Sequence, residues 1–139
     1  AFGRRIVPLL IKQLKAGKSI GFVLDQYAAP PMGVEASFFG VKPHTQAAVG
    51  LLASRTGAAV VPVFQRRDAR GVIHIVFEPA IELPAEVLDD PVRSTEIFVA
   101  RVEAWIRAAP AQWLWAHRRF KNVSWPDEQT HASAPATAQ

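Results

Sequence analysis

A short apolar run that stops at a carboxylate constrains the fold of this chain more than any other stretch. Five of the six residues 19–24 suit a β-strand that is buried on both faces, and Asp25 and Gln26 then end the run. Ligands of an open α/β sheet bind beyond the carboxyl ends of its strands. The pattern therefore predicts that Asp25 lies at a ligand site, with Gln26 beside it.

The segment after this strand predicts a long loop, which covers residues 27–40. Loops of this length often have a task beyond connection. Phe38 and Phe39, near its end, are interpreted as core residues that fix the loop. Gly40 indicates a backbone position that closely approaches another group. Thr45 is interpreted as a helix cap, with a position facing the site as the alternative.

Apolar residues at helical spacing predict three helices along the chain. The first ends at Gly17 and the second at Gly57, because glycine is the usual residue just past a helix C-terminus. The third begins with Asp90 as its cap and ends at Pro110. A short helix is expected to follow it.

Two further strands are predicted, at residues 59–64 and 72–77. Pro62 lacks an N–H donor, so it belongs at an edge, a bulge or the end of a strand. The alternation in 72–77 places His74 on the face opposite the apolar residues, and its sequence neighbours supply neither a second metal ligand nor a triad partner. The order of elements predicts an α/β domain, with a mixed β-sheet flanked by helices and its first two strands parallel.

The composition fits one soluble globular domain, because 139 residues with 50% hydrophobic and 20% charged side chains are ordinary for such a core. The chain has no cysteine, which excludes disulfides, thiolate zinc sites and a cysteine nucleophile within these residues. It has no apolar run long enough to span a bilayer and no signal peptide. Because residue 1 is alanine, we expect a processed product or a fragment, which a membrane anchor could precede.

The net charge of +4 is unevenly distributed. No acid precedes Asp25, and the basic residues form three groups: Arg4, Arg5, Lys12, Lys15 and Lys18; Arg66, Arg67 and Arg70; and Arg118, Arg119 and Lys121. Such clusters favour a polyanionic partner, which could be nucleic acid, phospholipid headgroups or an acidic protein. Solvated helix faces are the alternative, and we favour it for the lysines at 12, 15 and 18.

A family resemblance rests on three stretches that together span most of residues 6–121: KQLKAGKSIGFVLDQ, GVEASFFGVKPHTQAAVGLLASRTGAAVVPVF and QWLWAHRRFK. They resemble the bacterial lipid A biosynthesis acyltransferases, which move a fatty acyl chain from acyl carrier protein to a lipid A precursor. A more distant likeness is to the glycerolipid acyltransferases, whose carboxylate after a strand and proline in a later strand match Asp25 and Pro62. Those enzymes follow the acid with Gly and Thr, whereas Gln26 and Tyr27 stand here, so phosphate-contact roles do not transfer to this loop.

The resemblance implies a reaction in which a histidine, followed five residues later by an acid, deprotonates the acceptor hydroxyl. This chain has no such pair: the residues five after its histidines are Val49, Pro79, Asn122 and Ala136. In the family, the motif lies upstream of the region that matches residue 6. We therefore expect residues 1–121 to be the C-terminal half of an acyltransferase domain, and residues 122–139 to be a disordered tail.

The resemblance suggests roles for residues at both ends of the match. Asp25 could orient and electrostatically support the histidine of the other half, or could anchor a polar loop. Gln26 could donate to a carbonyl or a sugar hydroxyl, or be satisfied within its own turn. Arg118 and Arg119 could bind lipid phosphates or the acidic helix of a carrier protein, or one of them could pair with a carboxylate at the edge of the core.

Two tryptophans precede these arginines. Trp113 and Trp115 are of a kind enriched at membrane interfaces, or they could dock a C-terminal helix onto the core. We interpret the tryptophans as structural and one of the two arginines as functional. His117 is interpreted as a local hydrogen-bonding group.

The expected function is O-acyl transfer to a lipid A precursor, a glycolipid acceptor, at the cytoplasmic face of the bacterial inner membrane. Acyl carrier protein is the expected donor, with acyl-CoA as the alternative, and no metal or organic cofactor is implied. Without its base the chain alone is expected to be inactive. Acylation of phosphatidylinositol mannoside or another glycolipid is one alternative. The other is a noncatalytic basic module that binds anionic lipid or nucleic acid, although nucleic acid is not an expected partner of the enzyme.

Overall fold

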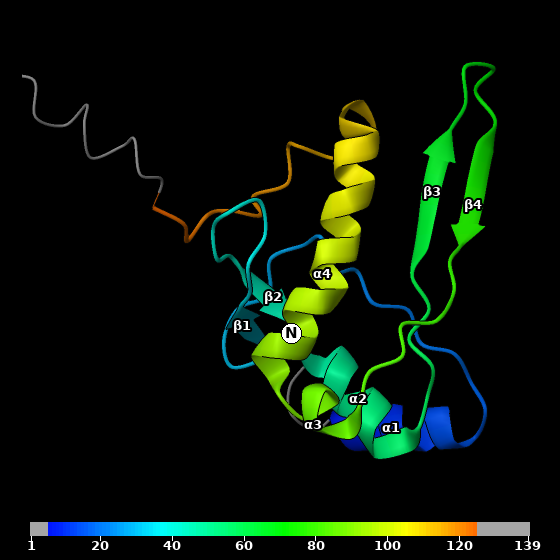
Figure 1. Ribbon diagram of the computed structural model, residues 1–139, viewed down its shortest axis with the longest axis vertical. Coiled ribbons are helices and arrows are strands. Elements are labelled where there is room, and N and C mark those ends of the chain that lie inside the picture. The colour runs from blue at the N-terminus through cyan, green and yellow to red at the C-terminus, as the bar shows by residue number, and fades with distance from the viewer. Residues whose placement is uncertain (1–5, 125–139) are drawn as a thin grey trace, which may run out of the picture.

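The computed structural model describes residues 6–124 and contains helices, strands and one 3₁₀ turn (Figure 1). The elements in chain order are α1 (Val7–Lys15), β1 (Gly33–Glu35), β2 (His44–Gln46), α2 (Ala48–Thr56), β3 (Val63–Arg67), β4 (Ile73–Phe77), α3 (Ala85–Leu88), α4 (Pro91–Ala108) and the 3₁₀ helix η2 (Pro110–Gln112). The predicted combination of helices and β-structure is confirmed.

The strands form two separate two-stranded antiparallel sheets. In the first, β1 pairs with β2 so that Val34 faces Thr45, and in the second, β3 pairs with β4 so that Gln65 faces Ile75. Figure 1 shows α4 standing between the two sheets, with the β3–β4 hairpin projecting beside it. The long helix therefore supplies the surface on which both sheets are placed.

Residues 19–24 form no strand, so the prediction of a buried β-strand there is wrong. No strand of the described residues pairs with them, so the expected parallel pair with residues 59–64 is absent. Phe22 and Leu24 are partly buried, but Val23 is 61% exposed, so the segment is covered on one side. A strand exists only with a hydrogen-bonded neighbour, and apolar character alone does not supply one.

Helix boundaries follow the local signals in most places. Gly17 and Gly57 have φ angles of 76° and 70° at the ends of α1 and α2, as predicted. The side chain of Asp90 accepts hydrogen bonds from the N–H groups of Val92 (3.0 Å) and Arg93 (2.9 Å), which confirms it as the cap of α4.

The prediction that Thr45 caps a helix is wrong. Thr45 lies in β2, and α2 begins three residues later at Ala48. The Oε1 atom of Gln46 instead accepts a hydrogen bond from the N–H of Ala48 at 3.2 Å. The antiparallel pairing of Thr45 with Val34 keeps it extended and so delays the helix.

One face of the β3–β4 hairpin packs on α4. The ring of Phe64 stacks on Trp105 with centroids 4.4 Å apart, and the carboxylate of Glu78 binds both Arg101 and the indole N–H of Trp105 (2.8 Å). These hydrogen bonds, that of Arg101 above all, hold the pKa of Glu78 below its ordinary value, against an opposing effect of burial. The opposite face is uncovered, and Phe77 there is 71% exposed.

His74 has a partner that its sequence neighbourhood did not suggest. Its Nε2 atom lies 2.9 Å from Oδ2 of Asp68, at the turn of the same hairpin. The residue lies on the hairpin surface, as predicted, and its partner is a single carboxylate six positions earlier. Within the described residues, no group of three or more His, Asp or Glu side chains converges as a metal site.

The ordered fold extends slightly past the predicted start of the tail. Asn122 donates to the hydroxyl of Tyr27 (2.9 Å) and lies 3.1 Å from Nδ1 of His44. The remainder of the predicted tail, residues 125–139, lies outside the described residues. Between residues 6 and 124, no helix is both long enough and apolar enough to cross a bilayer.

Candidate functional site

The loop after residues 19–24 is tied to the C-terminal segment by Arg119. Its Nη1 atom donates to the carbonyl oxygens of Gln26 (2.8 Å) and His44 (2.7 Å), and its Nη2 atom donates to the hydroxyl of Thr45 (2.5 Å). The Thr45 hydroxyl donates in turn to the carbonyl of Pro43 at 3.2 Å. One side chain therefore holds together the two segments that carry three of the predicted site residues.

The guanidinium of Arg119 is fully buried, with 0% of the residue exposed. Burial lowers its pKa below its ordinary value, to about 10, and the negative charge of Asp25 opposes that shift. The group therefore stays charged at neutral pH. It lies 5.0 Å from the ring centroid of Phe38, which adds a cation–π contact.

Asp25 is held by a tryptophan that is distant in sequence. The indole N–H of Trp113 donates to Oδ2 of Asp25 at 2.9 Å. The other carboxylate oxygen, Oδ1, has no hydrogen-bond partner among the described residues. A carboxylate held by one oxygen and open at the other can still accept a hydrogen bond from an imidazole or a substrate hydroxyl.

Trp113 owes its position to a cluster of aromatic rings at the end of the core. Its ring lies against Phe38 (6.0 Å between centroids), Phe39 (6.2 Å), Trp115 (4.6 Å) and Phe120 (6.3 Å). The structural interpretation of Trp113 is therefore supported, because the ring fixes the C-terminal segment against the core. Phe38 is 0% exposed and is a core residue, as predicted.

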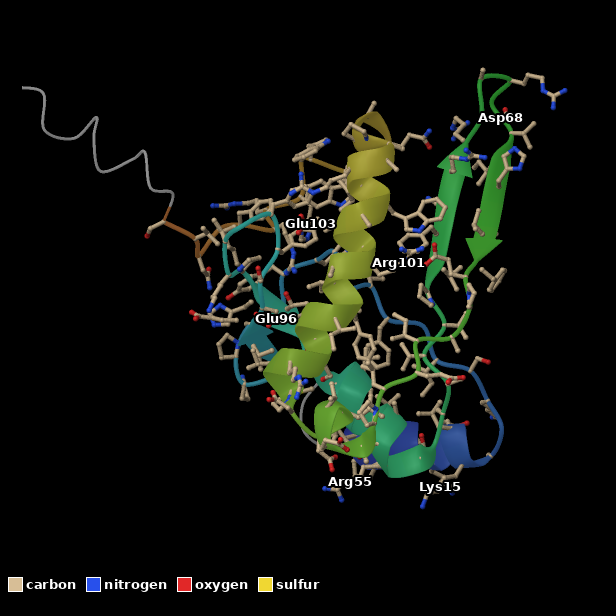
Figure 2. All side chains as sticks on the ribbon, in the orientation of Figure 1. Lys15, Arg55, Asp68, Glu96, Arg101 and Glu103 are labelled. Carbon is tan, nitrogen blue, oxygen red and sulfur yellow. The ribbon has the colours of Figure 1, made fainter. Side chains whose placement is uncertain are left out.

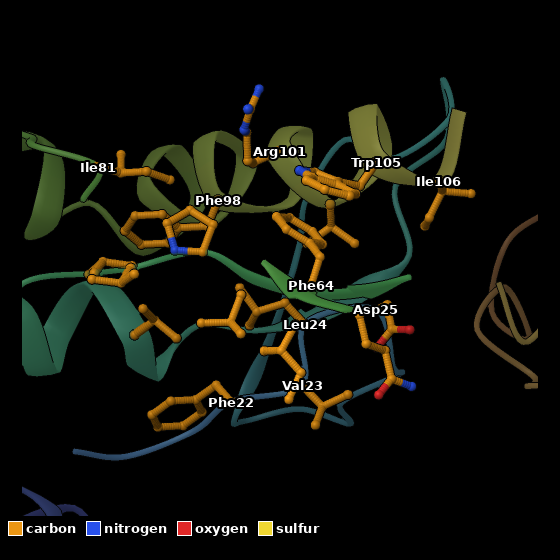
Figure 3. A pocket seen from close by; sticks show the side chains of 18 of the residues that line it. Phe22, Val23, Leu24, Asp25, Phe64, Ile81, Phe98, Arg101, Trp105 and Ile106 are labelled. Carbon is orange, nitrogen blue, oxygen red and sulfur yellow. The ribbon is translucent and has the colours of Figure 1, made fainter. Parts of the chain in front are cut away.

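An apolar groove of about 720 Å³ runs along the segment that ends at Asp25. Figure 3 shows Phe22 and Leu24 on one wall, Phe64 in the middle and the α4 residues Phe98 and Trp105 on the other wall. Asp25 lies at the end of the groove, next to Leu24. The site thus combines an apolar groove with a single carboxylate at one end.

The far end of the loop is held by two acids of α4 that the sequence patterns did not single out as site residues. Glu96 accepts from the N–H of Ser37 (3.1 Å), and Glu103 accepts from the N–H of Phe39 (2.6 Å). Figure 2 shows both acids on the side of α4 away from the hairpin, toward which Arg101 points. Acids seven residues apart on one helix face were the available signal.

The predicted site residues fall into two sets. Asp25, Gln26, Thr45 and Arg119 come together around the loop. Arg118 is exposed and makes no hydrogen bond or ion pair within residues 6–124. The predicted carboxylate partner of an arginine is absent at Arg119, which binds two carbonyls and a hydroxyl instead.

Gly40 is required for a reason different from the predicted one. A Cβ added there would meet nothing within 4 Å, so the backbone does not closely approach another group. Its φ angle is +78°, in the left-handed region that glycine adopts without strain. Gly40 therefore forms the turn between Phe38 and Val41, which face each other across an isolated bridge.

Comparison with known proteins places these features in a family. The family model described as bacterial lipid A biosynthesis acyltransferase matches residues 5–122. The chain is 34% identical over 115 residues to the lipid A biosynthesis lauroyltransferase of Escherichia coli (strain K12), which covers 81% of this chain and 37% of that protein. It is 26% identical over 106 residues to the lipid A biosynthesis acyltransferase of Haemophilus influenzae, which covers 76% of this chain and 32% of that protein.

The chain thus spans about a third of the length of the curated relatives it matches. The family match includes the Asp25 loop, the groove and the hydrogen bonds of Arg119 that hold this loop (the Arg119 clamp), and it ends at Asn122, which binds Tyr27 of the loop. By this match the chain belongs to the bacterial lipid A biosynthesis acyltransferase family.

Proposed function

We propose that this protein takes part in O-acyl transfer from acyl carrier protein to a lipid A precursor. The match of residues 5–122 to the family carries the proposal, and both relatives are named for acyl transfer in lipid A biosynthesis. Because the chain spans about a third of those relatives, the activity is proposed for a longer polypeptide that contains it.

Asp25 is proposed to support the base of the reaction. None of the four histidines in this chain is followed five residues later by an acid. The base is therefore a histidine of the part of the relatives that this chain does not match. That histidine takes the proton of the acceptor hydroxyl, the hydroxyl oxygen attacks the thioester carbonyl, and the thiolate leaves and regains a proton. Oδ1 of Asp25 is available to orient the imidazole and stabilise its positive charge.

The donor and the membrane are proposed to meet the exposed basic surface. Arg118 and Lys121 are exposed beside the clamped loop, and Trp115 is exposed in the same C-terminal segment. Arginine pairs well with phosphates and with the carboxylates of an acidic carrier protein. We place the reaction at the cytoplasmic face of the bacterial inner membrane, with acyl carrier protein as donor and acyl-CoA as the alternative.

The test uses a chimera in which residues 5–122 replace the matched part of the E. coli lauroyltransferase. Incubated with lauroyl-charged acyl carrier protein and a lipid A precursor, it is expected to yield a product heavier by one acyl group in a mass spectrum. Parallel reactions with lauroyl-CoA and with a phosphatidylinositol mannoside identify the donor and the acceptor class. Absence of product with every pair would contradict the proposal.

The role of Asp25 is tested in the same chimera. Asp25→Asn is expected to lower the rate by about 10²- to 10⁴-fold, the contribution of general acid–base catalysis, because the amide cannot stabilise an imidazolium. The asparagine oxygen still accepts from Trp113, but loss of the charge that offsets the burial of Arg119 should lower the thermal midpoint modestly, so the rates are compared well below both midpoints. The exposed acid Glu86 provides the control: Glu86→Gln should leave the rate unchanged. An unchanged rate in Asp25→Asn would remove Asp25 from the site.

A second candidate function is binding to an anionic lipid surface without catalysis. The β3–β4 hairpin exposes Phe77 and Ile75, and Arg66, Arg67 and Arg70 lie near its tip. This candidate predicts binding to phosphatidylglycerol vesicles that weakens steeply with salt, and no binding to phosphatidylcholine vesicles. Equal binding to both compositions would exclude it.

A further inference from the structure

Within the described residues, no strand lies beside the outer edge of β3. The carbonyl of Pro62 accepts from the N–H of Glu78 (3.0 Å), and the N–H of Asp68 donates to Val72 (2.9 Å). Because successive residues of a strand direct their backbone groups to opposite edges, even-numbered residues here face β4. The N–H and C=O groups of Val61, Val63 and Gln65 therefore face away from β4, and they make no backbone hydrogen bond among the described residues.

This open edge has a defined end. At Arg67 the side-chain amide of Gln112 pairs with the backbone as a neighbouring strand would. Its Oε1 accepts from the N–H of Arg67 (2.8 Å), and its Nε2 donates to the carbonyl of Arg67 (3.0 Å). The free edge thus runs from about residue 59 to residue 65 and stops where η2 closes it.

The edge lies in the apolar groove described above. Residues 58–66 form one side of the groove, α4 lines it with Phe98 and Trp105, and residues 20–25 form the other side. The backbone of residues 19–25 makes no backbone–backbone hydrogen bond within residues 6–124 either. Apolar side chains line the groove (Figure 3), and two of its walls carry backbone groups that have no backbone partner among the described residues.

We infer that an additional β-strand binds in this groove and pairs with the outer edge of β3. This strand comes from the part of the full-length protein that corresponds to the unmatched length of the relatives. The relatives have about two thirds of their length outside the match, which is ample for such a strand. The strand is apolar on both faces, because α4 covers one face and the exposed side chains of Val61 and Val63 continue on the other.

The unpaired backbone groups favour a β-strand in the groove over a fatty acyl chain or a second copy of this chain. A fatty acyl chain that filled the groove would cover the N–H and C=O groups of the edge without pairing with them, which costs free energy. In a second copy of this chain the same edge also lines a groove between residues 58–66, α4 and residues 20–25, so each edge would have to enter the groove of the other copy to pair. A single extended strand can enter the groove and form hydrogen bonds with the free N–H and C=O groups of the β3 edge.

The test measures amide hydrogen exchange in the chimera with the E. coli lauroyltransferase. The N–H groups of Val63 and Gln65 are expected to exchange as slowly as that of Phe64, which already faces β4. If Phe64 is protected while Val63 and Gln65 exchange at the rate of exposed amides, the edge is open and the inference is wrong. This readout does not depend on acyl transfer, so an inactive chimera with a closed edge would reject the proposed function alone.

A second measurement tests the inference if the chimera does not fold. The 139-residue chain and the unmatched part of the lauroyltransferase are produced together as two polypeptides, with an affinity tag on the second. Capture of the chain is expected to fall about tenfold for Val63→Asp, since a buried unpaired carboxylate opposes the strand. The matched control is Val72→Asp, because Val72 is 50% exposed and Val63 is 49% exposed, and Val72 lies outside the groove. The inference would be overturned by equal capture of both variants or by no capture of the unsubstituted chain. It would also be overturned if a homodimer of this chain protected the N–H of Val63 from exchange.

Discussion

Arg119 and His44 lie 75 residues apart in sequence and are joined by a hydrogen bond of 2.7 Å between Nη1 and the carbonyl oxygen. The same Nη1 atom binds the carbonyl of Gln26, 93 residues away. The C-terminal segment thus fastens the loop that carries Asp25 to the strand that carries Thr45. A site residue near the start of the match therefore depends for its position on a residue near its end.

The first prediction concerns this clamp. Arg119→Lys should lower the free energy of unfolding by about 2–4 kcal/mol, because a single ammonium cannot reach all three acceptors and leaves buried groups unpaired. The measurement is the urea midpoint at constant slope.

The adjacent arginine provides the control for this substitution. Arg118 is exposed, so Arg118→Lys should change the free energy of unfolding by less than about 0.5 kcal/mol. If the two variants lose stability equally, Arg119 does not act as a clamp.

The second prediction concerns the bond between Asp25 and Trp113. Trp113→Phe keeps an aromatic ring against Phe38 but removes the donor to Oδ2, so it should cost about 1–2 kcal/mol. A double-mutant cycle with Asp25→Ala separates the bond from the packing. A coupling energy above about 0.5 kcal/mol is expected, and additive effects would show that the bond contributes nothing.

The third prediction concerns Asp68. The hydrogen bond from His74 is the main cause that holds the pKa of Asp68 below its ordinary value of 3.8, and the N–H of Val72 contributes. A lowered carboxyl pKa stabilises the fold above pH 3.8, and this contribution is lost as the pH falls through the lower, folded-state value.

His74→Ala should therefore raise the pKa of Asp68 toward 3.8 and reduce the stability difference between neutral and acid pH. Carbon-13 NMR titration of the carboxyl group measures the shift. The remaining backbone hydrogen bonds should keep the value slightly below 3.8. An unchanged pKa in the variant would mean that the side-chain contact has no electrostatic effect.

Features set by local chemistry could be predicted from the sequence, and features set by distant partners could not. Gly17, Gly57 and Asp90 mark helix ends because the glycine conformation and the side-chain cap act within one turn. The strand expected at residues 19–24 failed because pairing needs a neighbour that the pattern cannot specify.

The candidate site shows the same division. Asp25 could be singled out because a charged residue ends an apolar run, and the structure places it at one end of the groove. Its partner Trp113 could not be identified, since a hydrogen bond across 88 residues leaves no local signal. Glu96 and Glu103 gave no signal beyond their spacing on one helix face, because the loop whose backbone they bind lies 59 or more residues earlier in the sequence.

The fourth prediction concerns Gly33, where β1 begins under the loop that follows Asp25. A Cβ at this position would lie 2.8 Å from the carbonyl carbon of Ala28 and closer still to its oxygen, and backbone atoms cannot rotate away. Gly33→Ala should therefore cost about 3 kcal/mol and shift the loop.

Gly21 is the matched position, since a Cβ there would meet nothing within 4 Å and its φ is not in the left-handed region. Gly21→Ala should be neutral or stabilise the fold by about 0.4–1 kcal/mol through the unfolded chain. Thermal unfolding of both variants measures the difference. If Gly33→Ala is as stable as Gly21→Ala, then Ala28 can move away from β1. In that case the Arg119 clamp alone, and not the close contact between Gly33 and Ala28, would set the position of the segment that follows Asp25.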